Sequence, residues 1–379
     1  MGAANAGAAV LVDVDALGAN DGTTWTDAFT DLHDALAAVG PGGAEIWVAE
    51  GTYYTGPLGA ARTESFTVPD GAALYGGFSG VETARAERDW IAHPTILSGD
   101  LARDGGASFA DDAYHVLVAT NADFTLDGFT VTNGAAGTSS GMNSFGGGAY
   151  VDGGNATVAN TIFLVNHGSG GAGVALVAGT AHFTGTTFRE NATYFYSGGG
   201  LWVNQNASAT IEDCLFDGNQ VRGAGSEGNG AGVFSYGSLD IARTIFVGNR
   251  AYQFSASMNF NSNGGAILSL FGPLTITDSA FYGNAAQMGG AIWVGSDTTI
   301  VNTVFSGNQA EPNSLIGDAY EAAIRVFLSD VSLVGVTMVG NHAAEEGGAI
   351  VAYSTPIAIE DSILWDNTSL PGTHPYLAQ

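Results

Sequence analysis

Residues 289–308 read GGAIWVGSDTTIVNTVFSGN, and the chain repeats this stretch in altered form at residues 264–284 (GGAILSLFGPLTITDSAFYGN) and 347–367 (GGAIVAYSTPIAIEDSILWDN). The unit ends on an asparagine, and eight copies align on that position: Asn166, Asn191, Asn219, Asn249, Asn284, Asn308, Asn341 and Asn367. A unit that recurs every 24 to 35 residues indicates a repeat architecture in which each copy is one structural layer.

Three apolar columns run through the aligned copies. A large apolar residue stands three places before the asparagine: Phe163, Phe188, Phe216, Phe246, Phe281, Phe305, Met338 and Leu364. Five places earlier stand Val158, Phe183, Ile211, Ile241, Ile276, Ile300, Leu333 and Ile359, and further upstream Tyr150, Val174, Leu201, Val233, Ile267, Ile292, Ile324 and Ile350. These spacings do not match the 3.6-residue period of a helix. Short β-rich runs broken by Asn, Asp or Gly, which tolerate left-handed backbone, instead predict strands with bends between them.

Coils of short strands that stack on one another form a parallel β-helix. We therefore predict an all-β solenoid of about ten or eleven coils over residues 46–367, roughly 50 Å long at the usual strand spacing. The asparagine column is predicted to form a ladder of side-chain hydrogen bonds along the stack. These repeated residues indicate core and corners, and they say nothing about a reaction.

The two ends of the chain differ from the repeats. Residues 1–45 are predicted to hold a strand and a capping helix, because Phe29, Leu32, Leu36 and Val39 have helical spacing. A helix over the open end of a solenoid would protect its strand edges. Residues 368–379 are predicted to be a C-terminal tail, and we expect the natural protein to continue beyond it.

Composition excludes several kinds of partner. The chain has 379 residues, 57 of them glycine, and a formal net charge of −28, and all nine of its basic residues are arginine. A field of that sign repels nucleic acid and anionic membranes, so neither is an expected partner. No run approaches 18 apolar residues, which predicts no membrane insertion, and the N-terminus does not read as a signal peptide. A single cysteine, Cys214, allows no internal disulfide.

The repeat pattern GGA[ILV]…FxxN resembles the repeats of chlamydial polymorphic outer membrane proteins and of bacterial pectin-lyase-like surface proteins. The segments LYGGFSGVETARAERDW (74–90) and YHVLVATNADFTLDGFTVTNG (114–134) also resemble the latter group. The resemblance covers most of residues 10–367. It implies a right-handed, single-stranded parallel β-helix, secretion or display at a bacterial cell surface, and adhesion or contact with a polysaccharide or cell-surface glycan.

Length variation between copies points to a binding edge. From each ladder asparagine to the next aliphatic column the chain takes 8 to 18 residues, whereas the rest of the unit is nearly constant. Insertions at one corner of a solenoid gather on one edge, which is commonly the binding edge. The long connections carry Tyr252, Phe254 and Tyr320 beside Arg222 and Arg250. We predict that these aromatic side chains contact a ligand.

An outward stripe is predicted beside those connections. The position after the aliphatic column holds Val151, Ala175, Trp202, Phe234, Leu268, Trp293, Arg325 and Val351, and strand alternation turns it away from the core. Trp202, Phe234 and Trp293 beside Arg325 would suit stacking on sugar rings and pairing with a carboxylate or sulfate. The alternative is that the long connections fold over the stripe and cover it.

One acidic segment is a candidate metal site. Asp100, Asp104, Asp111 and Asp112 offer the oxygen ligands that Ca²⁺ prefers. Their spacing is not that of an EF-hand, so a solvated acidic loop is the alternative. No cofactor is expected to be required.

Three functions remain open at this point. The leading prediction is a non-catalytic, secreted or cell-surface module that binds a glycan. The alternative is a polysaccharide lyase or another carbohydrate-active enzyme acting on acidic glycans. For a lyase, Arg325 is the weak candidate base, because it breaks the pattern as EAAIRVF. The third is a structural stalk or filament subunit whose rods associate end to end.

Overall fold

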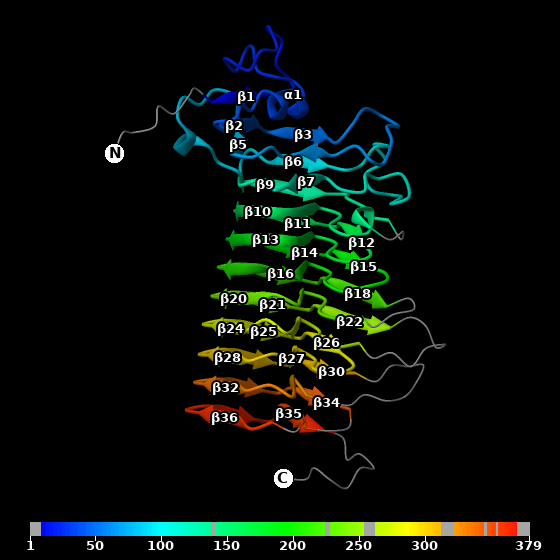
Figure 1. Ribbon diagram of the computed structural model, residues 1–379, viewed down its shortest axis with the longest axis vertical. Coiled ribbons are helices and arrows are strands. Elements are labelled where there is room, and N and C mark those ends of the chain that lie inside the picture. Colours follow the sequence, from blue (N-terminus) through cyan, green and yellow to red (C-terminus); the bar gives the residue numbers. More distant parts are fainter. Residues whose placement is uncertain are drawn as a thin grey trace.

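The coils of the chain contribute strands to three parallel sheets and stack along one axis (Figure 1). The computed structural model describes residues 9–137, 141–223, 228–253, 262–311, 322–344, 347–353 and 355–369. Within these residues sheet B has eleven strands, and ten spacings of about 4.8 Å make a stack about 50 Å long. The predicted all-β parallel β-helix is confirmed.

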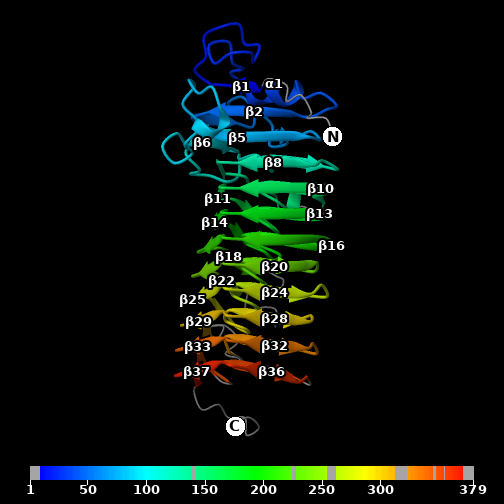
Figure 2. The ribbon, with the colours of Figure 1, turned by 90° about the vertical axis from the view of Figure 1, so that its left-hand side faces the viewer.

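Sheet A contains 19 of the 38 strands in the described residues, and from β19 onward each coil gives it two. Its strands are β1 Val10–Val12, β2 Ala44–Ala49, β4 Phe66–Thr67, β5 Ala72–Phe78, β7 Leu117–Thr120, β8 Phe124–Asp127, β10 Ala149–Ala159, β13 Val174–Thr184, β16 Leu201–Glu212, β19 Val233–Ser235, β20 Ser238–Ala242, β23 Ile267–Leu270, β24 Leu274–Thr277, β27 Ile292–Gly295, β28 Thr298–Val301, β31 Ile324–Phe327, β32 Val331–Val334, β35 Ile350–Tyr353 and β36 Ile357–Glu360. Figure 2 shows β10 to β36 one below another.

Sheet B holds one strand of each coil, and sheet C holds one strand of each of the last eight coils. Sheet B consists of β3 Gly51–Tyr54, β6 Thr95–Ser98, β9 Phe129–Thr132, β11 Ile162–Leu164, β14 Thr187–Arg189, β17 Leu215–Asp217, β21 Ile245–Val247, β25 Ala280–Tyr282, β29 Val304–Ser306, β33 Thr337–Val339 and β37 Ile363–Trp365. Sheet C consists of β12 His167–Gly168, β15 Ala192–Thr193, β18 Gln220–Gly223, β22 Arg250–Gln253, β26 Ala285–Ala286, β30 Gln309–Ala310, β34 His342–Ala343 and β38 Thr368–Ser369. The helical elements are α1 Leu32–Ala37 and the 3-10 turns η1 Arg85–Glu87 and η2 Met142–Ser144.

The predicted apolar columns form one continuous core that runs from Val12 to Met338. Alternate residues of each strand point inward, so each buried side chain meets its counterpart in the next coil. The phenylalanine rings from Phe163 to Phe305 stack with centroids 4.5 to 5.2 Å apart. Contact between like side chains in successive coils is the main apolar stabilisation of the fold.

The predicted bends between sheets A and B are confirmed by a column of left-handed residues. Asn160, Asp213, Asp278 and Asn302 have φ between 47° and 53°, a region in which Asn and Asp are tolerated better than other side chains. Arg243 occupies the same column with φ 48°. Its guanidinium pairs with Asp213 through two hydrogen bonds of 2.8 and 3.0 Å, which makes it a surface contact between coils.

The predicted capping helix is confirmed, but it is shorter than the run of residues with helical spacing. α1 begins after Asp31, whose side chain accepts a hydrogen bond from the backbone N–H of His33, and it buries Leu32, Ala35 and Leu36 against the core. Phe29 lies before the helix and forms a β-bridge with Val12. The helix covers the N-terminal end of the stack (Figure 1).

The last coil differs from those above it because its core positions are open to solvent. Its core-column residues Ile359 and Leu364 are 46% and 44% exposed, and Ile363 and Trp365, in register with the outward Thr337 and Val339, are exposed as well. Thr368 and Ser369, which were expected to lie in the tail, pair with β34 in sheet C. End-to-end association of rods stays a prediction. In the part of the chain that the structure describes, no helix is long and apolar enough to cross a membrane.

Candidate functional site

The long connections lie between each strand of sheet C and the next strand of sheet A, and we call this corner the looped edge. It carries the predicted ligand-contacting residues Tyr252, Phe254 and Tyr320. Of these, Phe254 and Tyr320 lie outside the residues that the structure describes.

The start of the looped edge forms a ladder of aromatic and cationic side chains. Arg222 pairs in register with Tyr252, and its guanidinium lies 5.5 Å above the ring of Tyr194. Gln220 accepts hydrogen bonds from Arg222 at 2.9 and 3.2 Å. Arg250 lies 5.7 Å above the ring of Tyr252. Arg250 also pairs with the carboxylate of Glu311, so Arg222 is the arginine of this ladder that can attract a carboxylate or sulfate of a ligand.

The outward stripe exists as a register-matched column of sheet A. Its members are Tyr150, Ala175, Trp202, Phe234, Leu268, Trp293, Arg325 and Val351. The expected first member, Val151, is wrong by one place, because β10 pairs Tyr150 with Ala175 and turns Val151 inward.

Most of the stripe is covered, which corrects the expectation of a continuous exposed surface. Phe234 is only 3% exposed and Leu268 only 2%. The glycine turn before β19 passes close to the backbone of the stripe. A Cβ on Gly230 would lie 3.0 Å from the Cα of Phe234. Trp202 is half-buried, with the ring of Phe145 5.0 Å away.

The C-terminal end of the stripe adjoins a group of aromatic side chains that are partly open to solvent. Trp293 is half-buried and its ring stacks at 6.2 Å on that of Phe327, which is 41% exposed. Arg325 lies in the next coil after Trp293, and its guanidinium lies 5.1 Å from the ring of Tyr353 and contacts Met288. We call Trp293, Phe327 and Tyr353 the aromatic face. These packing contacts do not place Arg325 as a catalytic base.

Beside the aromatic face, sheet A bends between its two strands, and the length of the bend alternates. The bend comprises residues 271–273 between β23 and β24, and residues 328–330 between β31 and β32. Between β27 and β28, in the coil that lies between these two, it comprises only residues 296–297. The strands on both sides stay in register across these coils. The middle coil therefore lacks one projecting residue, and this leaves a notch one coil wide.

Phe271 and Leu328 occupy the extra position on either side of the notch. Their φ angles are 71° and 51°, a region that bulky side chains avoid at a cost of about 1–3 kcal/mol each. Phe271 is 75% exposed and Leu328 is 64% exposed. The ring of Phe271 stacks at 5.4 Å on Tyr236 of the preceding coil, which orients it.

The bend notch is a pocket of about 330 Å³. It is lined by Phe271, Pro273, Gly295, Ser296, Asp297, Leu328 and Ser329. A shallow groove of about 520 Å³ continues from it over the second strands of sheet A. Thr275, Thr299 and Ser332 occupy its floor, and Asp297 and Asp330 stand at its rim. Hydroxyl and carboxylate groups beside exposed apolar side chains are the surface that sugars require.

The predicted calcium ligands are not brought together as a cluster. The carboxylate of Asp100 accepts the backbone N–H groups of Asp104 and Gly105 at 3.2 and 2.9 Å, and Asp104 accepts that of Ala107. These bonds shape a loop. Over the described ranges, no group of three or more His, Cys, Asp or Glu side chains could hold a metal ion. Calcium binding by Asp100, Asp104, Asp111 and Asp112 remains a prediction.

Asp112 is the unusual member of that segment. Its side chain is fully buried, and neither carboxylate oxygen has a hydrogen-bond partner. Burial, with added repulsion from Asp100 and Asp111, raises the pKa of the Asp112 carboxyl to about 8. Asp112 is therefore protonated over much of the neutral range in the folded protein.

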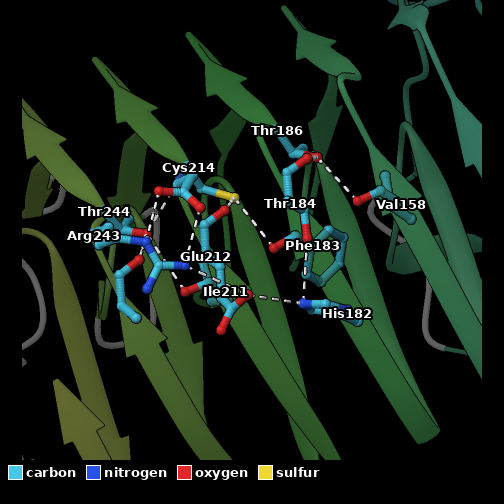
Figure 3. A network of polar contacts seen from close by, with 12 residues as sticks. Val158, His182, Phe183, Thr184, Thr186, Ile211, Glu212, Cys214, Arg243 and Thr244 are labelled. Carbon is cyan, nitrogen blue, oxygen red and sulfur yellow. Dashed lines mark hydrogen bonds and ion pairs between the residues drawn. The ribbon is translucent and has the colours of Figure 1, made fainter. Parts of the chain in front are cut away.

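Cys214 belongs to a ladder of small side chains between sheets A and B (Figure 3). Its thiol donates to the carbonyls of Glu212 and Phe183 at 3.1 and 3.5 Å, as the hydroxyls of Thr186 and Thr244 donate to the carbonyls two residues before them. Burial raises the pKa of the thiol to about 12. This leaves the thiol structural, because a nucleophile requires the thiolate.

The similarity of this chain to known proteins is weak. No family model matches the sequence, and no curated protein matches it. Among solved structures, pectate lyase Pel9A matches with 15% identity and a TM-score of 0.42, over 98% of this chain and 82% of its own. The surface adhesin PfbA of Streptococcus pneumoniae matches with 10% identity and a TM-score of 0.42, over 92% and 91%. The mannuronan C-5 epimerase AlgE4 A-module of Azotobacter vinelandii matches with 13% identity and a TM-score of 0.34, over 95% and 99%.

At these identities and TM-scores the similarities carry no argument about fold, ligand or reaction. The resemblance of the repeats to chlamydial polymorphic outer membrane proteins stays a prediction.

Sequence reasoning missed the bend notch. The signal was the length of the bend, because the six residues SLFGPL (269–274) of one copy match the five residues VGSDT (294–298) of the next. Phe271, Asp297 and Leu328 fall outside the repeated columns, and their importance follows only from their position between coils.

Proposed function

We propose that this chain is a non-catalytic, secreted or cell-surface β-helix module that binds a glycan through the aromatic face. The observation that carries the proposal is the stacked pair Trp293 and Phe327, held side by side on the rigid surface of sheet A. Rigid aromatic side chains lose little conformational entropy on binding and offer flat apolar area to the C–H faces of sugar rings.

The surroundings of the aromatic face support a glycan over a protein partner. The adjoining groove offers the hydroxyls of Thr299 and Ser332 and the carboxylates of Asp297 and Asp330, which can bond sugar hydroxyls along an extended chain. The looped edge, with Arg222 and Tyr252, supplies a second contact suited to an acidic group. Secretion or surface display belongs to this proposal because glycans of this kind lie outside the cell.

The test is retention on immobilised polysaccharides in affinity electrophoresis, with neutral and acidic polymers in separate gels. We expect Trp293→Ala and Phe327→Ala each to weaken retention at least tenfold, which corresponds to about 1.4 kcal/mol of binding free energy. Tyr282→Ala is the matched control, because Tyr282 is an aromatic residue of similar exposure (39%) on sheet B. It is expected to bind as the wild type does. If wild type and all three variants migrate as they do in plain gels, the proposal is overturned.

A further inference from the structure

We propose that the bend notch is a subsite for one uncharged sugar residue. The ring lies between Phe271 and Leu328, and its hydroxyl groups donate hydrogen bonds to the carboxylate of Asp297. This inference rests on the proposed glycan-binding function and names a ligand class and a position for it. The notch lies beside the aromatic face and uses different side chains.

The spacing of the coils fits a single ring. Phe271 and Leu328 lie two coils apart, which corresponds to roughly 9.6 Å at the usual strand spacing. Apolar contact of about 4.0–4.5 Å on each side of a flat ring adds up to roughly 8–9 Å. The pocket volume of about 330 Å³ lies at the lower end of small-molecule sites. A sugar residue therefore fills the notch in contact with both walls.

The negative charge of the notch favours an uncharged sugar residue over an acidic one. Asp297 and Asp330 are exposed at its rim, and neither forms an ion pair within the residues that the structure describes. Its lining includes no arginine or histidine. A uronate or a sulfated sugar would bring like charge beside these carboxylates, whereas a neutral hydroxyl donates a short, charge-assisted bond to them.

The backbone conformation of Phe271 and Leu328, the two walls of the notch, supports a role in ligand binding. Phe271 and Leu328 adopt left-handed conformations while their side chains remain largely in solvent, so core packing does not account for them. Gly272 allows this projection at Phe271, because a Cβ on Gly272 would lie 2.3 Å from the backbone of Gly237 in the coil before. Strain that is held in place by the fold and presents exposed apolar groups is typical of binding sites.

The experiment is isothermal titration calorimetry with tetrasaccharides of β-1,4-linked glucose, mannose and uronic acid. We expect a neutral tetrasaccharide to bind the wild-type protein, and Phe271→Ala and Asp297→Asn each to reduce its affinity at least tenfold. The matched controls are Tyr282→Ala, in the same coil as Phe271, and Asp366→Asn, an exposed aspartate after β37 of sheet B. Both controls are expected to retain wild-type affinity. Circular dichroism of each variant checks that it is folded.

Four outcomes separate this inference from the proposed function. Loss of affinity in Phe271→Ala and Asp297→Asn supports the notch. Loss in Trp293→Ala with wild-type affinity in both notch variants overturns the notch and leaves the aromatic face. Loss in the notch variants with no effect of Trp293→Ala supports the notch and overturns the aromatic face. Preferential binding of the uronate tetrasaccharide, in a manner that requires Asp297, overturns the assignment of an uncharged sugar.

Discussion

The side-chain amide of Asn249 donates hydrogen bonds to Oδ1 of Asn284 and to the carbonyl of Phe216, both at 2.9 Å. Its own Oδ1 accepts the backbone N–H and the side-chain amide of Asn219 at 3.1 and 2.9 Å. One buried side chain thus satisfies polar groups in three successive coils. The same pattern recurs from Asn166 to Asn341.

Replacing Asn249 is expected to destabilise the stack strongly. Asn249→Ala leaves buried polar groups of Phe216 and Asn219 without partners, and each such group costs roughly 1–3 kcal/mol. We expect the free energy of unfolding in guanidinium to fall by at least about 3 kcal/mol. Gln309→Ala, an exposed polar position, is the control and should change it by less than about 0.5 kcal/mol. Similar losses in both variants would contradict a special role of the ladder.

Two glycines should respond differently to alanine. A Cβ on Gly265 would lie 2.1 Å from the carbonyl oxygen of Gly290 in the next coil, whereas a Cβ on Gly307 meets nothing within 4 Å. Gly307 has φ 65°, so Gly307→Ala should cost only the left-handed strain of about 1–2 kcal/mol. Gly265→Ala must push two coils apart and should lower the melting temperature more. Equal melting temperatures would show that the coils are not packed this closely.

Asp112 should make stability fall as pH rises. Its pKa is about 8 in the folded protein and about 3.9 in an unfolded chain. Between these values the folded state binds a proton that the unfolded state does not, so stability is lost as pH rises from about 4 to about 8. Asp112→Asn removes this loss. The melting temperature of the variant, relative to wild type, should therefore increase across this window. The control Asp240→Asn should run parallel to wild type, and a parallel curve for Asp112→Asn would refute the argument.

His167 should make stability fall as pH falls, which is the reverse of the effect of Asp112. Burial, with the nearby charge of Arg222, lowers the pKa of His167 to about 4 from an ordinary value near 6.5. The unfolded chain binds the extra proton between these values, so stability is lost as pH falls from about 6.5 to about 4. His167→Phe should flatten this part of the thermal stability profile. An unchanged acid limb would mean that His167 is hydrated or charged in the folded protein.

The lyase alternative predicts a signal that we expect to be absent. Incubation with pectate, alginate and glycosaminoglycans, with and without Ca²⁺, should give no ultraviolet absorbance from unsaturated uronate. The reason is that Arg325 packs on Tyr353 and Met288. Absorbance that rises with wild type and disappears with Arg325→Ala would make the protein a lyase with Arg325 in its active site.

The fold could be predicted because its determinants repeat. Asn308 and Phe305 occupy positions where one side chain must match its neighbours in the coils above and below, so the same residue type returns. The covering of Phe234 could not be predicted, because it depends on how neighbouring side chains, such as the ring of Tyr236, pack against it. The aligned columns failed at Tyr150 for a related reason. Its copy contains the pattern GGGAY, and only strand pairing shows which glycine is matched to Gly173.

The bend next to Phe271 also affects which insertions and deletions the fold can accept during evolution. A one-residue insertion or deletion inside a sheet ordinarily slips the register and turns every following side chain to the wrong face. Here one coil is shorter by a residue, yet Leu270 still pairs with Gly295 and Leu274 with Thr298. Indels at this corner are therefore absorbed by the scaffold. Mutation can add or remove a projecting side chain one coil at a time. New binding surfaces can therefore arise by the insertion or deletion of single codons, and the protein still folds at each step.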